Sequence, residues 1–386
     1  MFQSGSPVKG ENFIDRKKHL PVFKSYLDNN QHIMIKAPRR FGKTSLIKHM
    51  FEYEKSYEYI YIDIRLHHTL ESLSKHILDK AYGFVKIENF MRQTKNSLLT
   101  LLQSIKTISI PEIAEVTVDM VSKDSDPIEL FIHSLDVVDK IATSKNLNIK
   151  VIFDEFQDIT KLYDKDILEV LRSVAQHHES ITYIFLGSIE SIMTQIFENK
   201  SSPFFHFASV IKLDGLDIEE LYIYTIDEFD KHNITYDKDV IWKTINFLEG
   251  HPEYSAKVLQ TLYINTILEK KSIDYKSAIE AISFRVCENR AYLDEVISKL
   301  KVKKHHFEVV YNIANNIKST IGSSTLYNTH ISLENMGIIQ KVQKGRYKIV
   351  DIFLKILLQQ HKDVMVSLDG KLDIELDSTI KTIGEV

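Results

Sequence analysis

One eight-residue loop limits the fold of this chain more than any other feature. Residues 31–36 form a short apolar run of the strand type, residues 37–44 read Ala-Pro-Arg-Arg-Phe-Gly-Lys-Thr, and residues 44–50 follow a helical pattern. The loop fits the phosphate-binding pattern G-x-x-x-x-G-K-[ST], except that Ala37 replaces the first glycine. A strand that leads through such a loop into a helix indicates an α/β fold with a phosphate site at the helix N-terminus.

The last three positions of this loop carry the predicted chemistry. Gly42 permits close approach of the backbone, Lys43 is expected to reach the outer phosphates of a nucleotide, and the Thr44 hydroxyl is expected to ligate magnesium. An isolated Gly-Lys-Thr is explained equally well as a chance turn, but the position between a strand and a helix argues against that explanation. The neighbouring residues of the predicted nucleotide-binding set are Pro38, Arg39, Arg40, Phe41 and Ser45.

Further strands and helices alternate after the loop. Runs rich in β-branched and aromatic residues predict strands at 57–64, 149–153, 181–186 and 210–213. Helical patterns lie between them, for example over residues 128–145. This alternation predicts a parallel sheet covered by helices on both faces.

The pattern changes after the last of these strands. At about 100–200 residues per domain, the 386 residues predict two or three domains. Residues 217–297 read as several amphipathic helices, and residues beyond 299 read as two helices and a small hairpin, the outline of a winged helix. We therefore expect a core over 1–215 with a surface-hairpin insertion at 105–121, a helical lid over 216–298, a winged-helix domain over 299–362 and a polar tail over 363–386.

Polar residues end two of the predicted strands. The strand at 149–153 runs into Asp154, expected to hold magnesium through water, and Glu155, expected to polarise an attacking water. A pair of surface carboxylates that caps a strand is the alternative, which the complementary loop at 37–44 makes weak. The strand at 181–186 ends near Ser188, either a sensor of the γ-phosphate at the same sheet edge or a simple turn serine.

Together these segments resemble the archaeal-type P-loop ATPases, relatives of the AAA+ proteins and of the STAND signalling NTPases. The resemblance implies an additional-strand, AAA+-like P-loop core that binds ATP or ADP with Mg²⁺ beneath the helical lid. It also implies that Arg16 lies near the base and ribose and that Pro252 closes over the base from the lid, although Pro252 also suits a helix start. The matching pieces are residues 13–16, 38–46, 153–157, 187–188, 250–252 and 347–351, spread over about residues 5–360.

The chain departs from this family at two places. Residues 203–207 read Pro-Phe-Phe-His-Phe where the family commonly has P-L-Y-G-R, and no arginine lies between residues 173 and 284. Since an arginine finger contributes about 10³ to 10⁵ in rate, we expect slow or partner-stimulated hydrolysis, with Arg39, Arg40 and Arg172 as candidate substitutes. Residues 314–335 leave room for one full helix only, which argues against base-specific reading of DNA.

Charge is unevenly distributed along the chain. The formal net charge is −4, yet residues 299–348 hold nine Lys and Arg against two acids, a local charge of +7. This segment is expected either to contact the phosphates of double-stranded DNA or to serve a protein partner, and the sequence favours neither.

Several classes of protein are excluded by composition. A single cysteine, Cys287, rules out an internal disulfide, residues 1–30 lack the apolar core of a signal peptide, and no apolar run approaches the roughly 18 residues of a membrane span. We therefore expect a cytoplasmic protein without a membrane partner. The histidines show no spaced ligand set, so no metal besides magnesium is expected.

The preferred hypothesis is an ATPase that couples binding and slow hydrolysis of Mg·ATP to movement between core, lid and winged helix. In it Glu155 activates water, while Lys43 and Ser188 act on the phosphates. The alternative is a STAND-like switch that binds nucleotide with little turnover and recruits a protein partner, and a third reading is a regulator that holds ADP tightly. The sequence does not predict the oligomeric state.

Overall fold

The computed structural model describes residues 2, 4–14, 16–53, 57–84, 126–163 and 167–360. The predicted insertion at 105–121 and the predicted tail at 363–386 lie outside these described residues. No helix in the described part of the chain is both long and apolar enough to cross a membrane.

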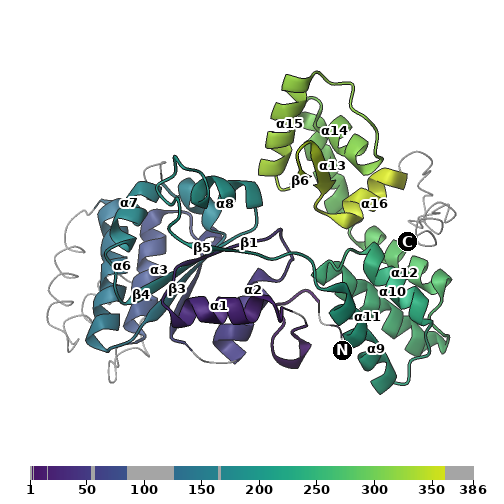
Figure 1. Ribbon diagram of the computed structural model, residues 1–386, viewed down its shortest axis with the longest axis horizontal. Coiled ribbons are helices and arrows are strands. Elements are labelled where there is room, and N and C mark those ends of the chain that lie inside the picture. The colour runs from purple at the N-terminus through teal and green to yellow at the C-terminus, as the bar shows by residue number, and fades with distance from the viewer. Residues whose placement is uncertain are drawn as a thin grey trace.

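A five-stranded sheet forms the first half of the molecule (Figure 1). Each neighbouring pair of strands is parallel, and the spatial order is β2-β3-β4-β1-β5. The strand that enters the phosphate-type loop, β1, is separated from the acid-bearing strand β3 by β4, which confirms the predicted additional-strand core. The strands are β1 (Ile33–Lys36), β2 (Tyr59–Asp63), β3 (Ile149–Asp154), β4 (Ile181–Gly187) and β5 (Ser209–Lys212).

Helices cover both faces of this sheet, as the alternation of elements predicts (Figure 1). Successive residues of a strand point to opposite faces, and in β1 Ile33 and Ile35 pack in one buried cluster while Met34 packs in another. The first cluster contains α1 (His19–Asp28) and α2 (Lys43–Lys48). The second contains α3 (Leu70–Tyr82), α6 (Pro127–Ser144), α7 (Ile167–Ala175) and α8 (Glu190–Phe197).

The register brings the functional strand ends to one edge of the sheet. Lys36 of β1 pairs with Gly187 of β4, and Asp63 of β2 pairs with Asp154 of β3. Because all five strands run in the same direction, the residues that follow them emerge side by side at the carboxyl edge, where open α/β sheets bind ligands.

After β5 the described residues form helices and one antiparallel hairpin. They share one continuous buried cluster that includes Phe229 in the first helix and Leu358 in the last. The helices are α9 (Ile218–Lys231), α10 (Lys238–Phe247), α11 (Pro252–Glu269), α12 (Tyr275–Glu288), α13 (Arg290–Val302), α14 (His306–Ala314), α15 (Ser323–Asn335) and α16 (Ile352–Gln360), and the hairpin strands are β6 (Ile339–Gln343) and β7 (Arg346–Ile349).

The C-terminal elements follow the order that the sequence indicates. Two helices, α14 and α15, precede the hairpin β6–β7, and residues 315–322 between them contain no helix, so a single full helix occupies the stretch from 314 to 335. The boundary predicted between residues 298 and 299 falls inside α13, whose Ile297 and Leu300 are both buried in the shared cluster. The division into lid and winged helix therefore stays a prediction.

Candidate functional site

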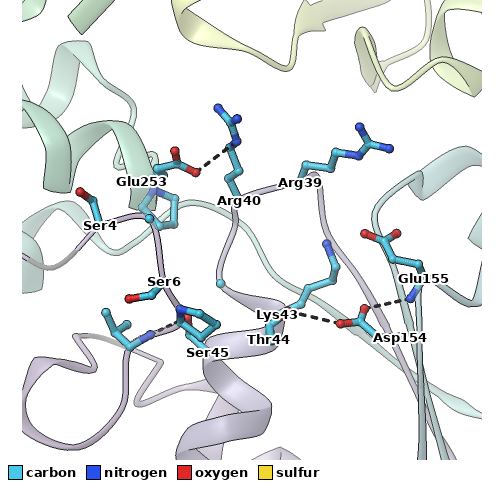
Figure 2. A pocket seen from close by; sticks show the side chains of 15 residues that line it. Ser4, Ser6, Arg39, Arg40, Lys43, Thr44, Ser45, Asp154, Glu155 and Glu253 are labelled. Atoms are coloured by element: carbon cyan, nitrogen blue, oxygen red, sulfur yellow. Dashed lines mark hydrogen bonds and ion pairs between the residues drawn. The ribbon is translucent and has the colours of Figure 1, made fainter. Parts of the chain in front are cut away.

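A cavity of about 540 Å³ lies between the loop after β1, the end of β3 and the start of α11 (Figure 2). Residues 4–8 of the N-terminal segment form another part of its wall, together with Glu253. The predicted residues that the structure brings together around this cavity are Arg39, Arg40, Gly42, Lys43, Thr44, Ser45, Asp154, Glu155 and Pro252.

The loop adopts the conformation that a phosphate cradle requires. Gly42 has φ +86° and precedes the first residue of α2, so the free N–H groups of the helix face the cavity. Ala37 is fully buried in the core and its N–H donates to the Gly187 carbonyl at 3.3 Å. A methyl group is thus accommodated where the pattern has its first glycine.

Lys43 lies across the mouth of this loop. Its Nζ donates to the carbonyl oxygens of Ala37 and Pro38, at 2.9 and 3.1 Å. Burial lowers the pKa of Lys43, and the nearby carboxylates of Glu155 and Asp154 act against that shift. The ammonium group is therefore a buried cation that donates to backbone carbonyls and can exchange them for phosphate oxygens.

Thr44 and Asp154 meet at the floor of the cavity (Figure 2). The Thr44 hydroxyl donates to Asp154 Oδ2 at 3.3 Å, the Tyr61 hydroxyl donates to the same oxygen, and the Glu155 N–H donates to Oδ1 at 2.9 Å. Burial raises the pKa of Asp154, while the hydrogen bond from Tyr61 lowers it. A buried carboxylate beside a hydroxyl is a set of hard oxygen donors, which fits Mg²⁺.

Glu155 is held by three side chains. It has φ +54° at the turn after β3, and its carboxylate accepts from Ser188 Oγ at 2.6 Å, from Gln157 Nε2 at 2.6 Å and from Arg65 Nη1 at 2.9 Å. Ser188 therefore lies beside Glu155, at the edge predicted from the sequence. Three donors thus occupy the Glu155 carboxylate, which leaves little room on it for the water that a general base would have to contact.

Arg65 is a residue of this site that the sequence analysis missed. It lies in the short 3-10 turn Ile64–Leu66 that follows β2, and its Nε also donates to Asp158 Oδ2 at 2.8 Å. Because β2 pairs with β3, a basic residue just after β2 reaches Glu155, but the sequence alone does not give this strand order.

Two of the predicted loop residues lie outside this cavity. Pro38 and Phe41 line a smaller cavity of about 30 Å³ against the C-terminal hairpin, next to His251 and Lys348. The Phe41 ring meets the His251 ring edge to face, with centroids 4.8 Å apart. These two side chains thus connect the loop to the C-terminal elements.

Arg16 lies beneath the loop rather than in the main cavity. It is 2% exposed, and its guanidinium donates to the carbonyl oxygens of Phe41 and Asp214, at 2.8 and 2.9 Å. It lines a mainly apolar cavity of about 70 Å³ that shares Gly42 and Pro252 with the larger one. Arg16 therefore ties the loop to the segment after β5.

Pro252 starts a helix, which is one of the two expectations raised by the sequence, while closure over a base stays a prediction. It occupies the first turn of α11, where His251 is the N-cap residue, and it also forms part of the wall of both cavities. Burial lowers the pKa of His251 to about 3, so this ring is neutral at physiological pH and stacks on Tyr254 with centroids 4.1 Å apart.

The three arginines considered as substitutes for an arginine finger are placed differently. Arg39 and Arg40 line the cavity, with Arg40 directed to Glu253 of α11 and Arg39 extended on the side of Glu155 (Figure 2). Arg172 of α7 instead donates to Gln176 at 2.8 Å and lies 4.4 Å from the centre of the Phe207 ring, away from the cavity.

Comparisons with known proteins identify the fold. No protein-family model matches the sequence, and no curated protein sequence matches it. The Walker-type ATPase PABY2304 of Pyrococcus abyssi has a similar structure, with a TM-score of 0.67 and 16% sequence identity over 93% of this chain and 99% of that one. The ORC2 protein of Aeropyrum pernix, in its ADPNP-ADP complexes, has a TM-score of 0.48 and 12% sequence identity over 93% of this chain and 98% of that one. The RuvB Holliday junction branch migration motor of Thermotoga maritima has a TM-score of 0.44 and 11% sequence identity over 91% of this chain and 97% of that one.

The first of these matches extends over nearly the full length of both chains. It confirms that the fold of this chain is that of a P-loop ATPase, as the sequence motifs predict. The other two structures are too distant to support a conclusion about this chain.

Proposed function

We propose that this protein binds Mg·ATP in the 540 Å³ cavity, hydrolyses it slowly, and uses the bound nucleotide to move the elements α9 to α16 relative to the sheet. The observation that carries the proposal is the joint placement of Lys43, Thr44, Asp154 and Glu155 around one cavity at the carboxyl edge of a parallel sheet. The name of the Pyrococcus abyssi protein with the same fold, a Walker-type ATPase, supports this assignment.

Each part of the cavity suits one part of the nucleotide. The N-terminus of α2 and Lys43 supply donors for the phosphates, and Thr44 and Asp154 supply oxygens for Mg²⁺, which when bound neutralises phosphate charge. The adjoining apolar cavity, walled by Phe13, Leu216 and Pro252, suits a flat base. Because the donors of Arg16 are directed at backbone carbonyls, we assign it to support that wall.

Slow hydrolysis follows from two features of the site. Glu155 is restrained by Arg65, Ser188 and Gln157, and the segment 203–207 presents no cation. Phe204 of that segment is fully buried in the core and Phe207 packs against it. This region is therefore built for packing, and a partner that supplies a cation or releases Glu155 is expected to stimulate turnover.

Arg40 links the cavity to the C-terminal elements. Its Nε lies 3.2 Å from Glu253 Oε2, and its Nη1 lies 3.3 Å from the Tyr254 hydroxyl, which in turn donates to Asp351 at the start of α16 at 2.8 Å. The guanidinium also lies 5.4 Å from the centre of the Tyr292 ring on α13. Phosphates in the cavity compete with Glu253 for this cation, so nucleotide binding changes how the loop holds α11, α13 and α16.

Replacing Arg40 by alanine is expected to uncouple nucleotide binding from this movement. Spin labels at Lys75→Cys on α3 and Lys344→Cys in the hairpin turn, in a Cys287→Ser background, report the distance between sheet and hairpin. A non-hydrolysable ATP analogue with Mg²⁺ should shift that distance in the parent protein. In Arg40→Ala the shift should disappear at saturating nucleotide, while nucleotide affinity falls by no more than about 150-fold, the upper limit for one hydrogen bond to a charged group.

Arg39→Ala is the matched control because Arg39 lies in the same loop and lines the same cavity. At saturating nucleotide this variant should keep the distance shift. An equal loss of the shift in both variants would show that loop charge in general, and not the contact with Glu253 and Tyr254, transmits the change.

Contact with double-stranded DNA is a second candidate function, which exposed basic residues of the C-terminal elements support. The side chains of Lys301, Lys303 and Lys304 are exposed at the end of α13, and those of Lys344 and Arg346 are exposed at the hairpin. In contrast, Lys299 is paired with Glu295 at 2.5 Å. Such a group of cations attracts DNA phosphates whatever the base sequence, so the affinity for DNA should fall steeply as the salt concentration rises.

The experiment that tests the proposed function measures ATP binding and phosphate release by the intact protein, with and without double-stranded DNA. Release that DNA stimulates would identify a DNA-coupled ATPase. Tight ATP binding without turnover under either condition would instead identify a nucleotide-dependent switch with a protein partner. Absence of ATP binding would refute the proposed function.

A further inference from the structure

Tyr61 on β2 is a polar residue at the metal end of the cavity that the proposed mechanism does not yet use. Its hydroxyl donates to Asp154 Oδ2, the same oxygen that the Thr44 hydroxyl approaches at 3.3 Å. Both residues that the proposed function assigns to Mg²⁺ therefore adjoin this one phenol group. The phenol itself is absent from the wall of the nucleotide cavity.

The sheet register explains how a residue in mid-strand reaches this position. Tyr61 pairs with Ile152 of β3, and Asp154 is two residues farther along the same strand and on the same face. Two residues of a strand span about 6.6 Å, a distance that the long tyrosine side chain covers but a shorter one does not. The Tyr61 ring packs against the buried cluster between the sheet and α1 and α2, which fixes its direction.

We propose that Tyr61 is a positioning residue of the metal site, which holds the Asp154 carboxylate in the orientation that binds Mg²⁺. This inference rests on the proposed function, because it assumes that Asp154 and Thr44 take the ion. Asp154 is 6% exposed, and its other oxygen accepts the Glu155 N–H at 2.9 Å. With a donor on each oxygen the rotation of the carboxylate is restricted, and Asp154 is held where it lines the cavity.

Removal of the phenol hydroxyl should affect the metal and leave the phosphate contacts in place. Lys43 and the N-terminus of α2 contact phosphate without help from Asp154, so binding of nucleotide alone does not depend on Tyr61. Mg²⁺ depends on it, since a carboxylate that can rotate loses part of its preorganised geometry.

The test compares Tyr61→Phe with Tyr59→Phe. Tyr59 lies two residues earlier on the same strand and face, and its ring lies 5.0 Å from that of Phe51, so the second variant removes a hydroxyl from the same face of β2 away from Asp154. Two quantities are measured on the intact protein: the affinity for ATP in excess EDTA, and the binding of Mn²⁺, as a spectroscopic substitute for Mg²⁺, by electron paramagnetic resonance in the presence of a non-hydrolysable ATP analogue.

We expect Tyr61→Phe to raise the Mn²⁺ concentration for half-saturation by about tenfold, the loss of one hydrogen bond to a charged group, with the affinity for ATP in EDTA unchanged. Tyr59→Phe should change neither quantity. Unchanged or tighter Mn²⁺ binding in Tyr61→Phe would overturn the inference, as would an equal loss of both affinities, which a general structural role predicts. If the parent protein fails to bind ATP or Mn²⁺ at all, the proposed function is wrong, and that result is distinct from a failure of Tyr61 alone.

Discussion

Lys43→Ala is expected to weaken ATP binding by about 100-fold or more, because two charge-assisted hydrogen bonds to phosphate oxygens contribute about 1.5–3 kcal/mol each. Lys43 is 6% exposed, and its ammonium group lies within the loop that would surround the phosphates, at 2.9 and 3.1 Å from two of its carbonyl oxygens. Isothermal titration calorimetry with Mg·ATP measures the loss directly.

The fold should survive this substitution. Lys43 is a buried cation, and Arg16 continues to hold the loop through the Phe41 carbonyl. Lys48→Ala is the matched control, since Lys48 lies on the same helix, is paired with Glu52 at 3.8 Å and is absent from the cavity wall. If Lys43→Ala keeps the parent affinity for Mg·ATP, and both variants unfold at the parent temperature, the assignment of the phosphate site to this loop is wrong.

Glu155→Gln should keep the affinity for ATP within about twofold of the parent value. It should lower the rate of hydrolysis by a factor of about 10² to 10⁴, the usual contribution of a general base. Glutamine keeps the shape of the side chain and an acceptor oxygen for Arg65, but it cannot take a proton from water. Phosphate release under single-turnover conditions isolates this step from product dissociation.

The control for this substitution is Glu169→Gln, which removes an exposed carboxylate on α7. It should change neither binding nor turnover. Turnover that persists in Glu155→Gln at the parent rate would mean that another group accepts the proton, and the restraint of Glu155 by Ser188, Gln157 and Arg65 would then have no catalytic meaning.

The parts of the site that the sequence predicts are those that local sequence marks. Gly42, Lys43 and Thr44 stand where a strand becomes a helix, and Asp154 and Glu155 follow an apolar run. Since parallel strands end at one edge, both groups are expected at that edge. The strands themselves are predicted for the same reason, because runs of β-branched and aromatic residues in this chain are short and well separated.

The residues that the sequence does not reveal depend on which strands are neighbours. Tyr61 and Arg65 touch the acids only because β2 lies beside β3, and both come from a run that reads as an ordinary strand and its end. Glu253 meets Arg40 across more than two hundred residues of chain. No local pattern encodes such contacts, which arise from strand order and from the packing of α11 against the loop.

Arg16 shows a limit of a different kind. The resemblance implies a place near the base and ribose; in the structure Arg16 lines the apolar cavity that we propose for the base, and its guanidinium donates to two backbone carbonyls beneath the loop. A buried arginine must pair its donors, and the nearest acceptors here are provided by the protein itself. A motif of one or two residues indicates where a side chain lies but not which acceptors it chooses.

The buried cluster that runs from α9 to α16 has a mechanical consequence. Turning α14 and α15 against α9 and α10 would open apolar surface to water, at a cost of about 25 cal/mol for each Å² exposed. The segment from 218 to 360 is therefore expected to resist internal rearrangement. If nucleotide moves this segment as proposed, the segment is expected to turn as one body, so that a displacement of a few ångströms beside Arg40 becomes a larger one at the hairpin turn around Lys344.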